Sequence, residues 1–90
     1  MFRTEYKGAD VIINEGPLNS RMNSSFAELL DAIIWNRFGY RLAGGSYYMG
    51  SLYVGFDTGC AVGWQRSIAD TIMTEFHIDH VFIDSTLYMQ

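Results

Sequence analysis

The residues best suited to chemistry are a single cysteine and two histidines in the second half of the chain. Cys60 stands where a helix is predicted to begin, and the free amides and dipole of a helix N-terminus lower the pKa of a thiol. With a histidine as base, Cys60 would be a nucleophile. A helix of about sixteen residues spans about 24 Å, so it holds His77 far from Cys60 and leaves only His80. A small buried cysteine is the simpler interpretation.

A second group, His77, Asp79 and His80, offers two imidazoles and a carboxylate, which are common metal ligands. Metal-binding pairs usually occupy one helix face or alternate strand positions, whereas these residues fall at a predicted junction. No further histidine or cysteine is present near them to complete a site. We therefore expect no metal and no cofactor, and a histidine near the negative end of a helix dipole is the simpler explanation.

Asp57-Thr58-Gly59 follows an apolar segment. It resembles the catalytic motif of retroviral-type aspartic proteases, which are small dimeric enzymes in which two aspartates share one proton. The resemblance covers three residues of ninety. Such enzymes also need later strands and an apolar-apolar-Gly segment, whereas the chain after this motif contains only Gly63, inside a predicted helix. A small hydrolase using Asp57 or Cys60 is kept as an alternative, and the expectation is that the protein is not an enzyme.

Periodicity and turn residues predict a single α+β domain over residues 1–90. Helices are predicted at 25–38, where an S-x-x-E capping box precedes an apolar stripe, and at about 60–76. The predicted strands lie at 2–6, 11–14, 47–49, 52–54 and 80–84, and residues 87–89 are a further candidate for the closing strand. Gly50-Ser51 matches a two-residue turn, so a hairpin of the third and fourth strands is favoured, and one long strand with a bulge at Gly50-Ser51 is the alternative. The order β-β-α-β-β-α-β favours a mostly antiparallel sheet with two helices packed on one face.

Charge and hydropathy exclude two classes of partner. The net charge is −4, and residues 67–90 contain acidic residues but no lysine or arginine. A protein that binds nucleic acid directly normally carries a basic stripe, so we expect no direct nucleic-acid binding. The apolar runs are far shorter than the roughly 20 residues of a membrane-spanning helix, and no signal peptide is recognised. We expect a cytoplasmic protein with no membrane contact.

The segment 45–59 is unusually rich in aromatic and aliphatic residues and has no lysine, arginine or proline. A continuous alternation along it places Tyr48 on the core face and Tyr47, Met49 and Tyr53 on the opposite face. A strand in a one-sided sheet normally has polar residues on its second face. These side chains therefore need cover from outside the domain, and their types are enriched at protein interfaces.

These observations predict a non-enzymatic module that binds a partner protein. The predicted contact residues are aromatic and methionine side chains together with the acidic residues of the last quarter: Tyr47, Tyr48, Met49, Tyr53, Trp35, Asp70, Glu75, Asp79 and Asp84. The acids would steer association towards a basic surface, such as that of a nucleic-acid-binding protein. By analogy alone, small acidic domains of this kind are often viral inhibitors of host defence nucleases, such as anti-CRISPR proteins. A homo-oligomer, most simply a homodimer, is the alternative.

Overall fold

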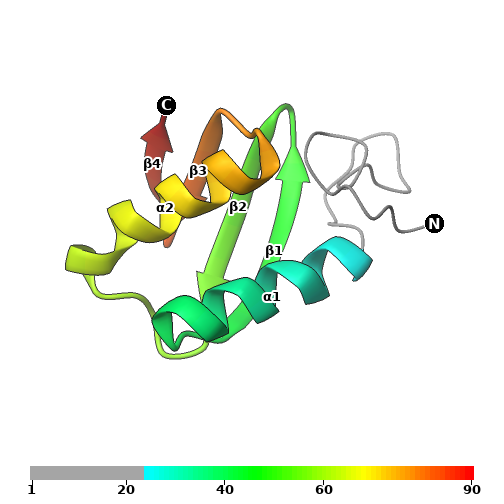
Figure 1. Ribbon diagram of the computed structural model, residues 1–90. Helices are drawn as coiled ribbons and strands as arrows, with labels where there is room; N and C mark the ends of the chain where they lie inside the picture. Colours follow the sequence, from blue (N-terminus) through cyan, green and yellow to red (C-terminus); the bar gives the residue numbers. More distant parts are fainter. Residues whose placement is uncertain (1–23) are drawn as a thin grey trace.

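The computed structural model describes residues 24–90, so the strands predicted at 2–6 and 11–14 lie outside the described residues. Along the described part the elements are α1 (Ser24–Phe38), β1 (Leu42–Tyr48), β2 (Ser51–Phe56), α2 (Val62–Phe76), β3 (His80–Ile83) and β4 (Thr86–Met89). The strands form one sheet in the order β1-β2-β3-β4, and both helices lie on the same face of it (Figure 1). The predicted α+β class is confirmed.

The sheet is mixed rather than wholly antiparallel. The pairs β1–β2 and β3–β4 are antiparallel, whereas β2 and β3 run parallel because α2 carries the chain back across one face. A parallel pair needs such a crossover connection. The predicted antiparallel character therefore holds for the two hairpins, and β4 adds a strand that the predicted element order does not contain.

The first helix buries one stripe of its surface and ends where a glycine follows it. Phe26, Leu30 and Ile34 are fully buried at successive i, i+4 positions. Gly39 has φ +77°, the left-handed conformation that favours glycine. Its N–H donates to the carbonyl oxygen of Trp35 over 3.0 Å. The helix therefore ends at Phe38, where its predicted range ends, and Gly39 stops it.

The second helix begins at Val62 rather than at the predicted Cys60. Ala61 is the residue before the first turn, and its backbone is extended, with ψ 138°. The buried stripe of α2 includes the polar residue Gln65, whereas the neighbouring Trp64 is half exposed. Gln65 is accommodated in the core because both ends of its amide are hydrogen-bonded, as described below.

The apolar core lies between the two helices and the sheet. It contains side chains from α1, β2, α2, β3 and two connecting loops: Phe26, Leu30, Ile34, Leu52, Val54, Phe56, Cys60, Ile68, Ala69, Ile72, Met73, Phe76, Ile78, Val81 and Ile83. The rings of Phe26 and Phe76 meet edge to face, with 4.8 Å between their centroids. This contact joins the first turn of α1 to the last turn of α2, and edge-to-face pairs add stability beyond their buried area.

The predicted β1–β2 hairpin is confirmed, but its turn lies one residue earlier than predicted. Met49 and Gly50 form the turn, with φ 50° and 83°, and Tyr48 pairs with Ser51. Positive φ at both central residues is the mark of a type I′ turn, whose twist matches that of the flanking strands. The glycine therefore occupies the second turn position and not the first.

Candidate functional site

No helix or strand of residues 24–90 covers the second face of the sheet, on the side away from α1 and α2 (Figure 1). Strand residues point alternately to the two faces, and the register brings the outward residues of neighbouring strands side by side. We call this surface the open face, and it consists of Gly44, Ser46, Tyr48, Ser51, Tyr53, Gly55, His80, Phe82, Leu87 and Met89.

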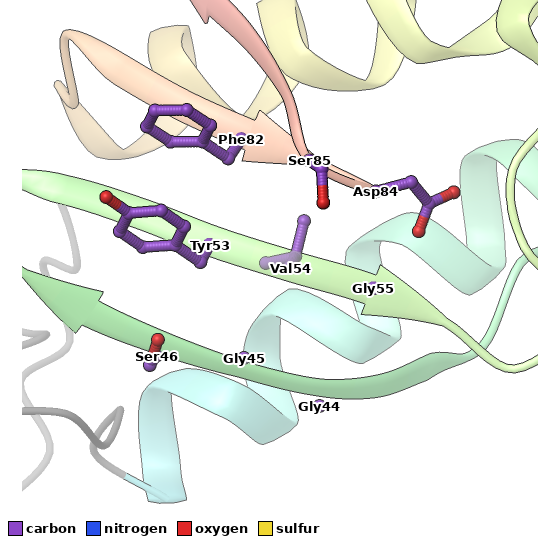
Figure 2. Close-up of a pocket in the computed structure, with 9 residues that line it drawn as sticks. All are labelled: Gly44, Gly45, Ser46, Tyr53, Val54, Gly55, Phe82, Asp84 and Ser85. Atoms are coloured by element: carbon purple, nitrogen blue, oxygen red, sulfur yellow. The ribbon is translucent and has the colours of Figure 1, made fainter.

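The open face carries large apolar side chains and no aspartate, glutamate, lysine or arginine. Tyr53 and Phe82 are register partners, and their rings stack 4.5 Å apart and within 6° of parallel (Figure 2). Leu87 and Met89 extend the surface across β4, and both are about half exposed. A solvated sheet face normally carries polar residues. An exposed apolar sheet face of this kind is typical of an interaction surface.

The two neighbouring tyrosines of β1 lie on opposite faces, in the reverse of the predicted assignment. Tyr48 pairs with Ser51 and shares the open face with Tyr53, whereas Tyr47 pairs with Leu52 and packs against the core. A two-residue turn pairs odd positions with even ones, so the alternation does not continue through the hairpin. Met49 lies in the turn itself and is 83% exposed.

Trp35 is also a predicted contact residue, but it lies on α1, on the helix side of the sheet. Its ring is partly exposed, and the guanidinium of Arg41 lies 4.2 Å from the ring centroid. Arg41 also pairs with Asp31 over 2.8 Å, and the other carboxylate oxygen of Asp31 accepts the N–H of Leu42. The structure therefore gives Trp35 a local partner and does not bring it to the open face.

Two of the predicted acidic contact residues lie on α2 and have basic partners. Asp70 pairs with Arg66 one helical turn away, with 3.2 Å between nitrogen and oxygen. Glu75 pairs with Arg37 of α1 over 3.3 Å. Exposed pairs of this kind contribute about 0–1 kcal/mol to stability. Each of these two acids therefore has a basic partner within the domain.

The other two acidic residues lie at opposite ends of β3. Asp79 precedes the strand and Asp84 follows it, a separation of about 17 Å along an extended chain. Asp84 forms the β3–β4 turn with Ser85, both at positive φ, and its N–H donates to the carbonyl oxygen of Val54. A carboxylate oxygen of Asp84 accepts the N–H of Cys60 over 3.0 Å. Asp84 thus joins the sheet to the loop before α2.

Cys60 lies in this loop and not in the first turn of a helix. The predicted lowering of its thiol pKa by a helix N-terminus is therefore wrong. Its carbonyl oxygen accepts a hydrogen bond from the amide of Gln65, whose oxygen accepts the hydroxyl of Tyr88 over 2.6 Å. Burial, and then the nearby charge of Asp84, raise the pKa of the Cys60 thiol. A raised pKa lowers the fraction of thiolate, which is the nucleophilic form.

We expect Cys60 to react slowly with iodoacetamide in the folded protein. At about pH 8 its alkylation should be at least about tenfold slower than in urea-unfolded protein, because the side chain is 8% exposed and its pKa is raised. The pKa of the Cys60 thiol is higher in the folded protein than in the unfolded protein. Its contribution to the free energy of unfolding is therefore complete below the unfolded pKa and is lost as pH rises through the folded pKa. Mass spectrometry measures the rate of alkylation, and equal rates in the folded and the urea-unfolded protein would contradict the expected slow reaction.

Neither histidine reaches Cys60. His77 ends α2 at the far end of the helix, and His80 pairs with Ser51 at the start of β2, whereas Cys60 follows the end of β2. Asp57 lies in the turn after β2, where its N–H donates to the carbonyl oxygen of Arg41. Within residues 24–90 no group of three or more histidine, cysteine, aspartate or glutamate side chains is placed to hold a metal ion.

Phe82, Leu87 and Met89 contribute to the open face but were not among the residues predicted to make contacts. A signal for Phe82 was present, because it alternates with the two aliphatic core residues of its strand. Leu87 and Met89 alternate in the same way with Tyr88, which faces the core side. The short length of β4 made this pattern weak.

Within residues 24–90 the structure is a small α+β domain, and the strands that form its open face carry no aspartate, glutamate, lysine or arginine. Comparison with protein-family models, with curated proteins and with solved structures gave no match to this chain. In the described part of the chain, no helix is both long enough and apolar enough to cross a membrane.

Proposed function

We propose that this protein is a non-enzymatic module that binds a partner protein through the open face. The observation that carries the proposal is the combination of large apolar side chains with the lack of any formal charge on the described strands of that face. Contiguous apolar patches on small domains mark interaction sites. The side chains project from hydrogen-bonded strands, so little conformational freedom is lost on binding.

The charge balance supports a basic partner surface. The chain has a net charge of −4, and Asp79 and Asp84 flank the open face at the two ends of β3 without lying in it. Charges at the rim of an interface accelerate encounter and orient the partner. Proteins that handle nucleic acid present basic surfaces. An inhibitor that occupies such a surface, and so competes with nucleic acid, is the specific form of this proposal.

A homodimer is the second candidate, and the same face favours it. Two copies could bring their open faces together without placing like charges opposite one another, because those strands carry none. Symmetric dimers are the commonest oligomers. Light scattering at two protein concentrations distinguishes the candidates, because self-association through this face raises the mean mass with concentration and would leave the face unavailable to another protein.

The proposal predicts that a double variant of β4, Leu87→Thr with Met89→Thr, loses its partner and keeps its fold. Both side chains are about half exposed, and threonine suits an edge strand. The experiment is affinity purification from the native host, identification of the protein captured, and measurement of its affinity by calorimetry. We expect the double variant to bind at least about tenfold more weakly than the native protein.

The matched control is Trp35→Gln, which removes an exposed aromatic side chain from the helix side of the sheet. It should bind the captured protein as the native chain does. If Trp35→Gln abolishes binding and the β4 variant does not, the contact surface lies on the helix side and the proposal is wrong. Circular dichroism of both variants checks that each is folded.

A further inference from the structure

At one end of the open face lies a shallow hollow with a volume of about 590 Å³. The stacked rings of Tyr53 and Phe82 stand at one end, and Asp84 with Ser85 of the β3–β4 turn stands at the other (Figure 2). Backbone of β1 and β2 forms its floor. The hollow therefore combines an aromatic wall, an open floor and a carboxylate.

The floor is open because two paired strand residues are glycines. Gly44 of β1 is the register partner of Gly55 of β2. A Cβ at Gly44 would meet no atom within 4 Å, and a Cβ at Gly55 would approach the Oδ1 atom of Asp84 at 3.7 Å. Neither glycine has a positive φ, so the turn geometry does not require them. The register of the pair shifts between Leu42 and Gly44, and glycine inside a strand marks such a bulge or a place where another molecule comes close.

The carboxylate of Asp84 is fixed in position over this floor. Its Oδ2 atom accepts the N–H of Cys60, which leaves Oδ1 on the side of Gly55. Tyr53 lies two residues before Gly55 on the same strand, a distance of about 7 Å. The hollow therefore presents a ring surface and an anionic acceptor at a spacing that one long side chain can span.

We propose that the hollow receives an arginine side chain of the partner protein. The guanidinium pairs with Asp84, and the aliphatic stem crosses the glycine floor against the ring of Tyr53. Arginine fits because its planar cation pairs with carboxylates and its stem and plane pack on aromatic rings, whereas the lysine ammonium is a compact, strongly hydrated charge. The net charge of −4 also favours a positively charged ligand. This inference rests on the proposed function, and it specifies the chemistry of the partner.

The test uses the whole chain and a small probe, N-acetyl-arginine methylamide, followed by ¹⁵N–¹H NMR titration. We expect saturable shifts of the backbone amide signals of Gly44, Gly55 and Ser85. The lysine analogue should bind more weakly. Asp84→Asn should weaken binding of the arginine probe about tenfold, because asparagine keeps an oxygen for the Cys60 N–H and tolerates positive φ but lacks the charge.

Two further variants make the result decisive. Gly44→Val fills the floor with a residue that suits a strand, and it should abolish the shifts without lowering stability. Asp57→Asn is the matched control, because it removes an exposed carboxylate outside the hollow and should leave the affinity unchanged. Should Gly44→Val fail to fold, Asp84→Asn against Asp57→Asn still decides the question.

Absence of saturable shifts, or equal affinity in the native protein and in Asp84→Asn, would overturn this inference. Neither result touches the proposed function, because the β4 variant tests the open face outside the hollow. If the β4 variant binds the captured protein normally while the arginine probe fills the hollow, the inference stands and the contact lies at the hollow end of the open face, without β4.

Discussion

Phe76→Ala is expected to lower the free energy of unfolding by about 3–5 kcal/mol, out of the roughly 5–15 kcal/mol that stabilises a typical domain. Phe76 is 1% exposed and closes the core at the end of α2, against the ring of Phe26. Its removal leaves a cavity that α1 and the sheet can fill only in part. Urea unfolding followed by circular dichroism measures the change.

The control for this substitution is Thr74→Ala, an exposed position two residues earlier on the same helix. It should change stability by no more than about 0.5 kcal/mol. A loss below about 1 kcal/mol for Phe76→Ala would mean that the packing of α1 on α2 contributes little. The edge-to-face contact would then not be a main tie between the two helices.

Local signals were enough to predict the helices and the hairpin. The stripe that includes Phe26, Leu30 and Ile34 fixes the buried face of α1, and Gly39 fixes its end. These features depend on residues within a few positions of one another, for which periodicity and backbone preference are good guides. The α+β class follows from the succession of such elements.

The parallel pairing of β2 with β3 could not be obtained in the same way. A helix between two strands permits a parallel neighbour, but the order of elements does not say which strands are neighbours. The hydrogen bond between Cys60 and Asp84 could not be predicted either, because it joins residues 24 positions apart in the chain. The sequence placed Cys60 at a helix start, whereas the structure places it in a loop bound to the end of β3.

Which residues of the aromatic segment share a face could not be predicted from alternation alone. The faces depend on the turn. A turn at Met49-Gly50 makes Tyr48 a neighbour of Tyr53 and turns Tyr47 towards the core. The turn therefore decides which tyrosine is available to a partner, and it does so without changing the composition of the segment.

The adjacent tyrosines of β1 provide a matched pair of variants that differ only in the face they occupy. Tyr47→Ser is expected to lower the free energy of unfolding by about 1–3 kcal/mol, because the ring packs against the core. Tyr48→Ser is expected to change it by no more than about 0.5 kcal/mol, since Tyr48 lies on the open face and is 40% exposed. Urea unfolding of each variant provides both values.

Binding should show the opposite order. Tyr48→Ser should weaken binding of the captured partner at least about tenfold, because aromatic side chains are enriched among the residues that carry binding energy, whereas folded Tyr47→Ser should bind as the native protein does. A continuous strand would place Tyr48 on the core face and Tyr47 on the opposite face, so it requires the reverse result, with Tyr48→Ser losing stability and Tyr47→Ser losing affinity. Normal binding by Tyr48→Ser would place the contact away from the β1 side of the open face. Only the hairpin register predicts that Tyr47→Ser mainly lowers stability and that Tyr48→Ser mainly lowers affinity.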